Sequence, residues 1–234
     1  MSRPLEGNVA FVTGASRGIG AAVAVELARM GAHVVATART QGGLEETDDA
    51  IRAAGGAATL LPLDLLDGDQ LDMVGPTVFE RFGRLDVVVH AAATLGKLTP
   101  VAHILNDDWT EVAGVNLTAG LRVIRTTAPL LMNAPAGRAV FLTDARASAP
   151  GAYWAPYAAT KAGLQHLVQS WAAEVLTSRL RVNLFDPGPV ATRLRRRAFP
   201  GEDQAALPHP ADVAPALAAL CLAGETRNGA VVTF

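Results

Sequence analysis

The sequence predicts a single α/β domain in which helices cover both faces of a mostly parallel sheet of about seven strands. Its apolar runs are short and continuous rather than alternating, which is typical of strands buried on both faces. Longer segments with helical spacing lie between these runs. Repeated β-then-α order gives parallel strands joined by right-handed crossovers, and therefore a doubly wound sheet. The 234 residues, 50% of them hydrophobic, suffice for one core and would be cramped as two.

The expected elements follow one another without a Ser/Gly linker, a repeat or a low-complexity tract. Gly31 is suited to end the first helix, and Asp212 is available for the first turn of the last one. The irregular stretch 187–210, rich in proline and arginine, is long enough to predict a functional flap. Apolar runs predict strands at 8–13, 33–38, 58–63, 85–91, 138–143, 181–186 and 230–234. Helical spacing predicts helices at 18–31, about 44–54, 68–82, 107–132, 156–178 and 211–223.

Composition excludes several classes of function. The net charge of −2 gives no general affinity for nucleic acid. The lone Cys221 cannot form an intrachain disulfide and fits a reducing compartment. The start of the chain lacks the pattern of a signal peptide, and no apolar stretch approaches the roughly 20 residues that span a bilayer. We therefore expect a cytoplasmic protein without a membrane partner, and no Cys/His/Asp spacing suggests a metal site.

A glycine-rich turn, TGASRGIG at 13–20, joins the first predicted strand to the first predicted helix. Gly14, Gly18 and Gly20 allow a tight turn, close approach of the backbone to a ligand, and packing of the helix on the sheet. The start of the helix supplies free N–H groups and a partial positive charge that suit a pyrophosphate. An ordinary tight turn would look similar, but this turn lies at the first βα junction of an alternating chain. We favour a dinucleotide site.

The end of the second predicted strand bears on the choice of dinucleotide. A carboxylate there would accept hydrogen bonds from a free ribose 2′-OH and indicate NAD, but the sequence has Ala38 followed by Arg39. With Arg17 nearby in the glycine turn, two guanidiniums suit a 2′-phosphate. NADP(H) is therefore favoured over NAD(H), although both arginines could simply be solvated. Asp64, at the end of the third strand, could bond the adenine edge or cap the next helix.

A tyrosine and a lysine stand four residues apart in the predicted helix 156–178. At this spacing Tyr157 and Lys161 share one helix face. A free phenol has a pKa of ~10, too high for efficient proton exchange near neutrality, and a nearby ammonium lowers it. The pair therefore indicates proton transfer, although a surface pair without a role is common.

Taken together, four motifs resemble the short-chain dehydrogenase/reductase family over nearly the whole chain. They are TGASRGIG, Asn116 in VNL, YAATK at 157–161 and PGPVAT at 187–192, in the family's order and spacing. The resemblance implies a Rossmann fold, so that residues 1–234 form one dinucleotide-binding and catalytic domain. It implies hydride transfer between nicotinamide and a small-molecule carbonyl or alcohol substrate. It also implies a homo-oligomer, a dimer or tetramer, through paired helices that include the one bearing Tyr157.

The resemblance further implies residue roles. Tyr157 would be the proton donor or acceptor, Lys161 would bind the nicotinamide ribose and lower the tyrosine pKa, and Asn116 would hold a relay water through a local helix irregularity. Pro187, Gly188 and Thr192 would lie at the nicotinamide end. The full set of expected cofactor contacts is Gly14, Ser16, Arg17, Gly18, Ile19, Gly20, Arg39, Asp64, Leu65, Ala91, Ala92, Tyr157, Lys161, Pro187, Gly188 and Thr192.

Two positions depart from the family's pattern. After the fourth strand the family has Asn-Asn-Ala-Gly where this chain has His90, Ala91, Ala92 and Ala93. The small residues still permit close approach of the backbone to a cofactor, but the side-chain amides that steady neighbouring strands are lost. Thirteen residues before Tyr157, where the family has a catalytic serine, the chain has an aspartate.

This aspartate, Asp144, offers only acceptors when ionised, repels the negative charge that develops on a substrate oxygen, and raises the pKa of Tyr157. Four interpretations stay open. Thr143, or less well Ser148, could supply the hydroxyl, or Asp144 could be protonated and donate a hydrogen bond itself. The substrate could instead carry a cationic group. Finally, Asp144 could act only as a capping residue or pair with Arg146 or another arginine, in which case the catalytic serine is lost.

Substrate recognition is expected from the flap and from loops at the carboxyl ends of the strands. A basic cluster there could attract an anion or could be one solvated helix face: Arg193, Arg195, Arg196 and Arg197. Tyr153, Trp154 and Phe199 could form an apolar wall or an interface. The main hypothesis is an NADP(H)-linked reductase or dehydrogenase. The rival is a dinucleotide-binding sensor or scaffold without turnover.

Overall fold

A computed structural model of the protein describes residues 3–234. The seven strands are β1 (Val9–Thr13), β2 (His33–Ala38), β3 (Ala57–Pro62), β4 (Val87–His90), β5 (Arg138–Leu142), β6 (Arg181–Asp186) and β7 (Val231–Thr233). They form one sheet in the order β3-β2-β1-β4-β5-β6-β7, and every neighbouring pair is parallel. The predicted α/β fold with a doubly wound sheet of seven strands is confirmed. The order reverses between β1 and β4, where such folds bind ligands.

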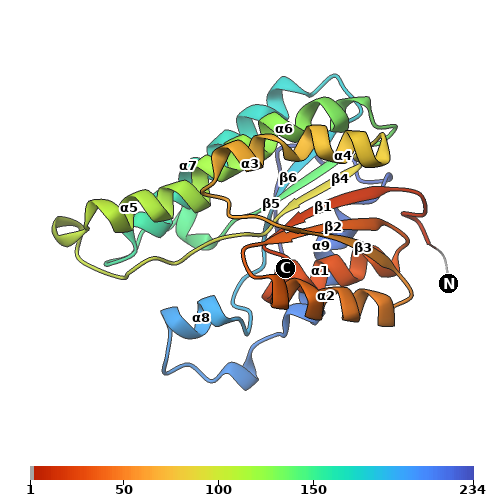
Figure 1. Ribbon diagram of the computed structural model, residues 1–234. Helices are drawn as coiled ribbons and strands as arrows, with labels where there is room; N and C mark the ends of the chain where they lie inside the picture. Colours follow the sequence, from red (N-terminus) through yellow and green to blue (C-terminus); the bar gives the residue numbers. More distant parts are fainter. Residues whose placement is uncertain (1–2) are drawn as a thin grey trace.

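Helices cover both faces of the sheet (Figure 1). One face carries α1 (Gly18–Arg29), α2 (Gln41–Ala53) and α9 (Pro210–Ala219), and the other carries α3 (Gly68–Asp72), α4 (Val74–Phe82), α6 (Ala119–Asn133) and α7 (Ala155–Glu174). Each layer encloses its own apolar core, because the side chains of a buried strand point alternately to the two faces. Val12 packs in one core and the adjacent Phe11 in the other.

Two predicted helices are interrupted. The helix predicted over 68–82 is two helices, because Pro76 lacks an N–H and its ring would clash with the carbonyl of Asp72. Thr126 of α6 bridges the break: its hydroxyl donates to the Asp72 carbonyl and accepts from the Gly75 amide, both at 2.8 Å. The helix predicted over 107–132 is α5 (Asn106–Ala113), a π-helical turn (Gly114–Thr118) and α6.

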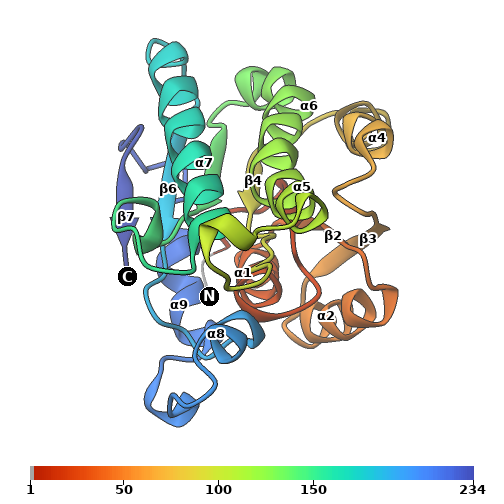
Figure 2. The same ribbon diagram turned by 90° about the vertical axis from the view of Figure 1, so that its left-hand side faces the viewer.

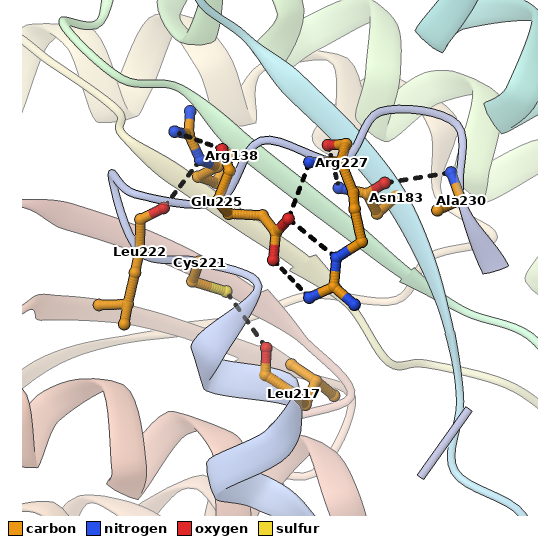
Figure 3. A network of polar contacts seen from close by, with 8 residues as sticks. All are labelled: Arg138, Asn183, Leu217, Cys221, Leu222, Glu225, Arg227 and Ala230. Carbon is orange, nitrogen blue, oxygen red and sulfur yellow. Dashed lines mark hydrogen bonds and ion pairs between the residues drawn. The ribbon is translucent and has the colours of Figure 1, made fainter. Parts of the chain in front are cut away.

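The predicted flap leaves β6 and returns at α9. It holds a short helix, α8 (Arg193–Ala198), and a 3₁₀ turn, Gln204–Ala206. In Figure 1 α8 lies beyond the left-hand ends of the strands, and Figure 2 looks onto those ends. Buried polar side chains of β5 and β6 fix the segment between α9 and β7. Arg138 donates to the carbonyl oxygens of Leu222 and Ala223. Figure 3 shows the bond to Leu222 and the contacts of Asn183 with Arg227 and Ala230.

Within residues 3–234, none of the helices is long and apolar enough to cross a membrane.

Candidate active site

A cleft of about 580 Å³ lies along the carboxyl ends of the strands. It is lined by the glycine-rich turn, the ends of β2 to β6, the start of α7 and the flap. Almost every residue predicted for the site lines it: Gly14, Ser16, Arg17, Gly18, Ile19, Gly20, Arg39, Asp64, Leu65, Ala91, Ala92, Thr143, Asp144, Tyr157, Lys161, Pro187, Gly188 and Thr192. Asn116 is the exception, because its side chain is fully buried behind the wall.

At one end of the cleft the backbone forms a cradle for an anion. Gly14 has a φ of +69°, and a Cβ there would lie 2.8 Å from the Ala92 backbone, so only glycine fits. Helix α1 starts at Gly18, and its N-cap residue Arg17 makes no side-chain capping bond. The first-turn N–H groups of α1 therefore have no intrahelical partner and face the cleft as donors. This arrangement fits a pyrophosphate.

Next to this cradle lie the two predicted arginines. Arg17 donates to the Thr40 hydroxyl at 3.2 Å, and Arg39 lines the same wall. Asp64 accepts the Leu66 amide at 3.0 Å in a local turn and lines the cleft. The N-cap of α3 is Asp67, whose side chain accepts the Gln70 amide, so Asp64 does not cap the next helix, and its contact with the adenine edge stays a prediction.

At the other end of the cleft, Tyr157 and Lys161 lie together on α7. The Lys161 Nζ is 5.8 Å from the centre of the Tyr157 ring and donates to the Leu142 carbonyl at 2.9 Å. Of the three residues that could replace the family's serine, Asp144 faces the phenol: the Tyr157 hydroxyl donates to Asp144 Oδ2 at 3.4 Å. Ser148 does not line the cleft. The Thr143 hydroxyl donates instead to Gln165 Oε1 at 3.4 Å. In this structure the third member of the group is therefore Asp144.

Charges at this end correct one expectation. Burial raises the pKa of Tyr157, and the Asp144 carboxylate, its hydrogen bond and the Asp186 carboxylate raise it further. In this structure the pKa of Tyr157 is therefore raised, which is opposite to the lowering that we expected from Lys161. Burial also lowers the pKa of Lys161 to about 8, against the opposing effect of Asp144 and Asp186. Asp186 was missed in the sequence, although an acidic residue at a strand's carboxyl end was the available signal.

Asn116 lies in the π-helical turn, where the resemblance implied a helix irregularity. Its side-chain oxygen accepts the Thr94 amide at 2.8 Å, and its amide group donates to the Thr94 carbonyl at 2.9 Å and the Thr160 hydroxyl at 3.2 Å. Asn116 therefore ties the π-helical turn and α7 to the loop after β4, which forms a wall of the cleft.

The substrate side of the cleft has aromatic walls. Trp154 lies edge-on to Tyr157, with ring centres 5.8 Å apart, and Phe199 of the flap lies 5.6 Å from Trp154. Tyr153 is exposed and does not line the cleft. Arg195 stacks on Phe199 and is paired with Glu202. Of the predicted basic cluster, Arg193, Arg195 and Arg197 line the cleft and Arg196 does not.

The chain is similar to known proteins over most of its length. The family model of the short chain dehydrogenases matches residues 8–203. An Escherichia coli K12 protein named "Uncharacterized oxidoreductase YciK" is 33% identical over 233 residues, which are 98% of this chain and 92% of that protein. The 3-oxoacyl-acyl-carrier-protein reductase FabG of Salmonella typhimurium is 31% identical over 191 residues, 82% of this chain and 77% of the reductase.

Solved structures agree with this. A short-chain dehydrogenase from Shigella flexneri 2a, in complex with NADP, superposes with a TM-score of 0.94 at 31% identity and covers 100% of this chain and 99% of that one.

Proposed function

The chain belongs to the short-chain dehydrogenase family, and on this premise we propose that it is an NADP(H)-linked oxidoreductase acting on a small carbonyl or alcohol substrate. The observation that carries the proposal is the cleft itself, which joins an anion cradle at the start of α1 to a tyrosine and a lysine on α7. A nicotinamide cofactor bound there supplies or accepts the hydride. No comparison favours the rival interpretation, a cofactor-binding protein without turnover.

The preference for NADP(H) rests on the charges at the adenine end. Arg17 and Arg39 line the wall next to the cradle, and Ala38 stands where NAD-binding proteins carry a carboxylate. Guanidinium groups bind a phosphate through charge-assisted hydrogen bonds, whereas they gain little from a free hydroxyl. The NADP held by the Shigella relative supports the same choice.

The cofactor preference can be measured by titrating the protein with NADPH and NADH. We expect NADPH to bind more tightly, and Arg39→Ala to weaken NADPH binding roughly tenfold while NADH binding changes little, because one charge-assisted contact is lost. Arg52→Ala, at the far end of α2, is the control and should change neither affinity. Equal affinities of the unmutated protein for the two cofactors would refute the preference.

In the proposed reaction Tyr157 exchanges a proton with the substrate oxygen. Its hydroxyl lies at the cleft surface, and Lys161 holds an ammonium beneath its ring. Asn116 acts as a positioning residue, since it fixes the loop after β4 against α7. NADPH oxidation followed with a panel of aldehydes and ketones tests the reaction. Tight NADPH binding without turnover on any substrate would contradict it. The predicted homodimer or homotetramer is tested separately by light scattering.

A further inference from the structure

The carboxylate of Asp144 is held in one orientation at the reactive end. Its Oδ1 accepts the backbone amide of Arg146 at 2.7 Å, which fixes the side chain at the start of the 3₁₀ turn Ala145–Ala147. Its Oδ2 is turned toward the Tyr157 hydroxyl at 3.4 Å. This distance is long for a hydrogen bond between oxygen atoms, so Oδ2 keeps capacity to accept another donor. The cleft therefore presents a donor and an acceptor side by side.

Within residues 3–234, no cation forms an ion pair with Asp144. Its nearest sequence neighbour of opposite charge, Arg146, places its guanidinium over the Trp154 ring, 4.8 Å from the centre. Arg195 is close enough for its charge to interact with Asp144, but its guanidinium is held by Glu202, with 2.6 Å between Arg195 Nε and Glu202 Oε2. Lys161 donates to the Leu142 carbonyl. Asp186 is also close enough to act on Tyr157, so two carboxylates act on the phenol, and within the described residues none of these three cationic side chains donates a hydrogen bond to Asp144.

The carboxylate of Asp144 disfavours a simple ketone as the substrate. A carbonyl oxygen within reach of the Tyr157 hydroxyl would lie close to Asp144 Oδ2, and both atoms only accept hydrogen bonds. Negative charge that develops on that oxygen during hydride transfer would be repelled by the carboxylate. The phenol proton would also be shared with Asp144 rather than given wholly to the substrate. A substrate that brings its own cation removes each of these difficulties.

We propose that the substrate is an α-amino ketone, or the corresponding amino alcohol in the reverse direction, and that Asp144 binds its ammonium group. The carbonyl oxygen and the nitrogen on the adjacent carbon of such a compound lie about 3 Å apart when they are on the same side. The Tyr157 hydroxyl and Asp144 Oδ2 are 3.4 Å apart, so one molecule can engage both at once. The inference rests on the proposed function and names its substrate class.

The ammonium also favours proton transfer. Because it offsets the charge of Asp144, it counteracts one of the causes that raise the pKa of Tyr157. The reaction balances: the carbonyl carbon gains a hydride from NADPH, its oxygen takes the Tyr157 proton, and the products are a protonated amino alcohol and NADP⁺. Water then returns a proton to the phenolate. Asp144 is unchanged throughout and serves as the specificity residue.

Three isosteric ketones test the proposal: aminoacetone, hydroxyacetone and butanone, compared at a pH where the amine is protonated. We expect kcat/KM with NADPH to be at least about tenfold higher for aminoacetone than for butanone, which is the effect of one hydrogen bond to a charged group. Equal values for the three ketones would overturn the inference and leave the proposed function intact.

Variants of Asp144 supply the second comparison. Asp144→Asn keeps the shape and removes the charge, so the preference for aminoacetone should disappear. Asp144→Ser should also raise kcat/KM for butanone, because a hydroxyl donates to the substrate oxygen. Asp49→Asn, which removes an exposed carboxylate of α2, is the matched control and should leave the preference unchanged. Unfolding temperature and NADPH affinity show that each variant is folded. A preference that survives in Asp144→Asn would refute the role of this residue.

Binding gives a readout that does not need turnover. Calorimetry on the protein saturated with NADP⁺ should show that the amino alcohol derived from aminoacetone binds at least about tenfold more tightly than butanol, and that Asp144→Asn removes the difference. If no ketone is reduced, the proposed function fails, while this measurement still decides whether Asp144 selects a cation. No difference in affinity would overturn the inference.

Discussion

A buried cation lies at each end of β5, and the hydrogen bonding of the two cations differs. At the first residue of the strand, Arg138 donates to five backbone carbonyl oxygens, those of Gly137, Arg179, Leu222, Ala223 and Glu225. At the last residue, the Leu142 carbonyl accepts a hydrogen bond from Lys161, which also lines the cleft and is close to the carboxylates of Asp144 and Asp186. Both side chains are 3% exposed. Burial of a charge therefore does not distinguish a functional group from a structural one.

What distinguishes them is whether their hydrogen bonds are complete. Three of the carbonyls around the Arg138 guanidinium belong to the segment that leads into β7. In the same segment Glu225 and Arg227 pair with each other at 2.6 Å (Figure 3). Such a set has no capacity for a ligand and stabilises the chain. Around Lys161, Asp144 and Tyr157, hydrogen bonds are long or absent on the side that faces the cleft. Incomplete bonding next to a cavity indicates the place for chemistry.

The largest expected effect comes from removing the proton donor. Tyr157→Phe should lower kcat/KM by about 100- to 10,000-fold, the usual contribution of a general acid or base. NADPH affinity and the unfolding temperature should change little, because within residues 3–234 the hydroxyl makes a single, long hydrogen bond. Tyr153→Phe, on an exposed ring outside the cleft, is the control. Activity that persists in Tyr157→Phe would show that another group supplies the proton.

A substitution at the opposite end of β5 should change the stability of the protein rather than its cofactor binding. Arg138→Met removes the guanidinium from five carbonyls, of which those of Gly137 and Leu222 keep a backbone donor, and should lower the free energy of unfolding by about 3 kcal/mol in urea denaturation. NADPH affinity should be retained, since none of these groups lines the cleft. Arg125→Met, on an exposed face of α6, should cost less than about 0.5 kcal/mol. If Arg138→Met is as stable as this control, the structural interpretation of Arg138 is wrong.

A third buried group, His90, should make the free energy of unfolding depend on pH. Burial, together with the charge of Lys161, lowers the pKa of His90 from 6.5 to about 3. The unfolded chain then binds a proton that the folded chain does not, so the free energy of unfolding should fall as pH drops from 6.5 toward 3. His90→Asn should remove this part of the pH dependence, and His103→Asn, in an exposed turn, should not. Parallel pH profiles for His90→Asn and the unmutated protein would contradict the assignment.

Lys161 should give a smaller pH dependence of the free energy of unfolding, in the alkaline range. Its pKa falls from 10.5 to about 8, so the folded state loses its proton first and the free energy of unfolding should rise as pH increases above 8. Tyr157 has a raised pKa and acts in the opposite sense above its ordinary pKa of ~10, which makes pH 8 to ~10 the useful range. Lys161→Met should flatten the profile there. A profile of unchanged slope would exclude Lys161 as its source.

Much of the fold was readable because its signals are local. Continuous apolar runs gave β2 and β6 with their bounds, and Gly31, with a φ of +107°, follows the end of α1 as expected of a terminating glycine. The break between α3 and α4 was also in the sequence, in Pro76, but was not used. The π-helical turn at Asn116 could be expected only from the resemblance, since its bonds to Thr94 and Thr160 come from distant segments.

The sequence by itself determined the alternation of strands and helices, the glycine turn and the Tyr157–Lys161 face, because each follows from backbone geometry over a few residues. Only the tertiary structure decided that Asp144 rather than Thr143 faces the phenol, and that Asp186 joins it. These outcomes depend on how β5, β6 and α7 pack and on how burial strengthens charge interactions. The acidity of the phenol is a sum over neighbours from several elements, and two residues four apart cannot reveal its sign.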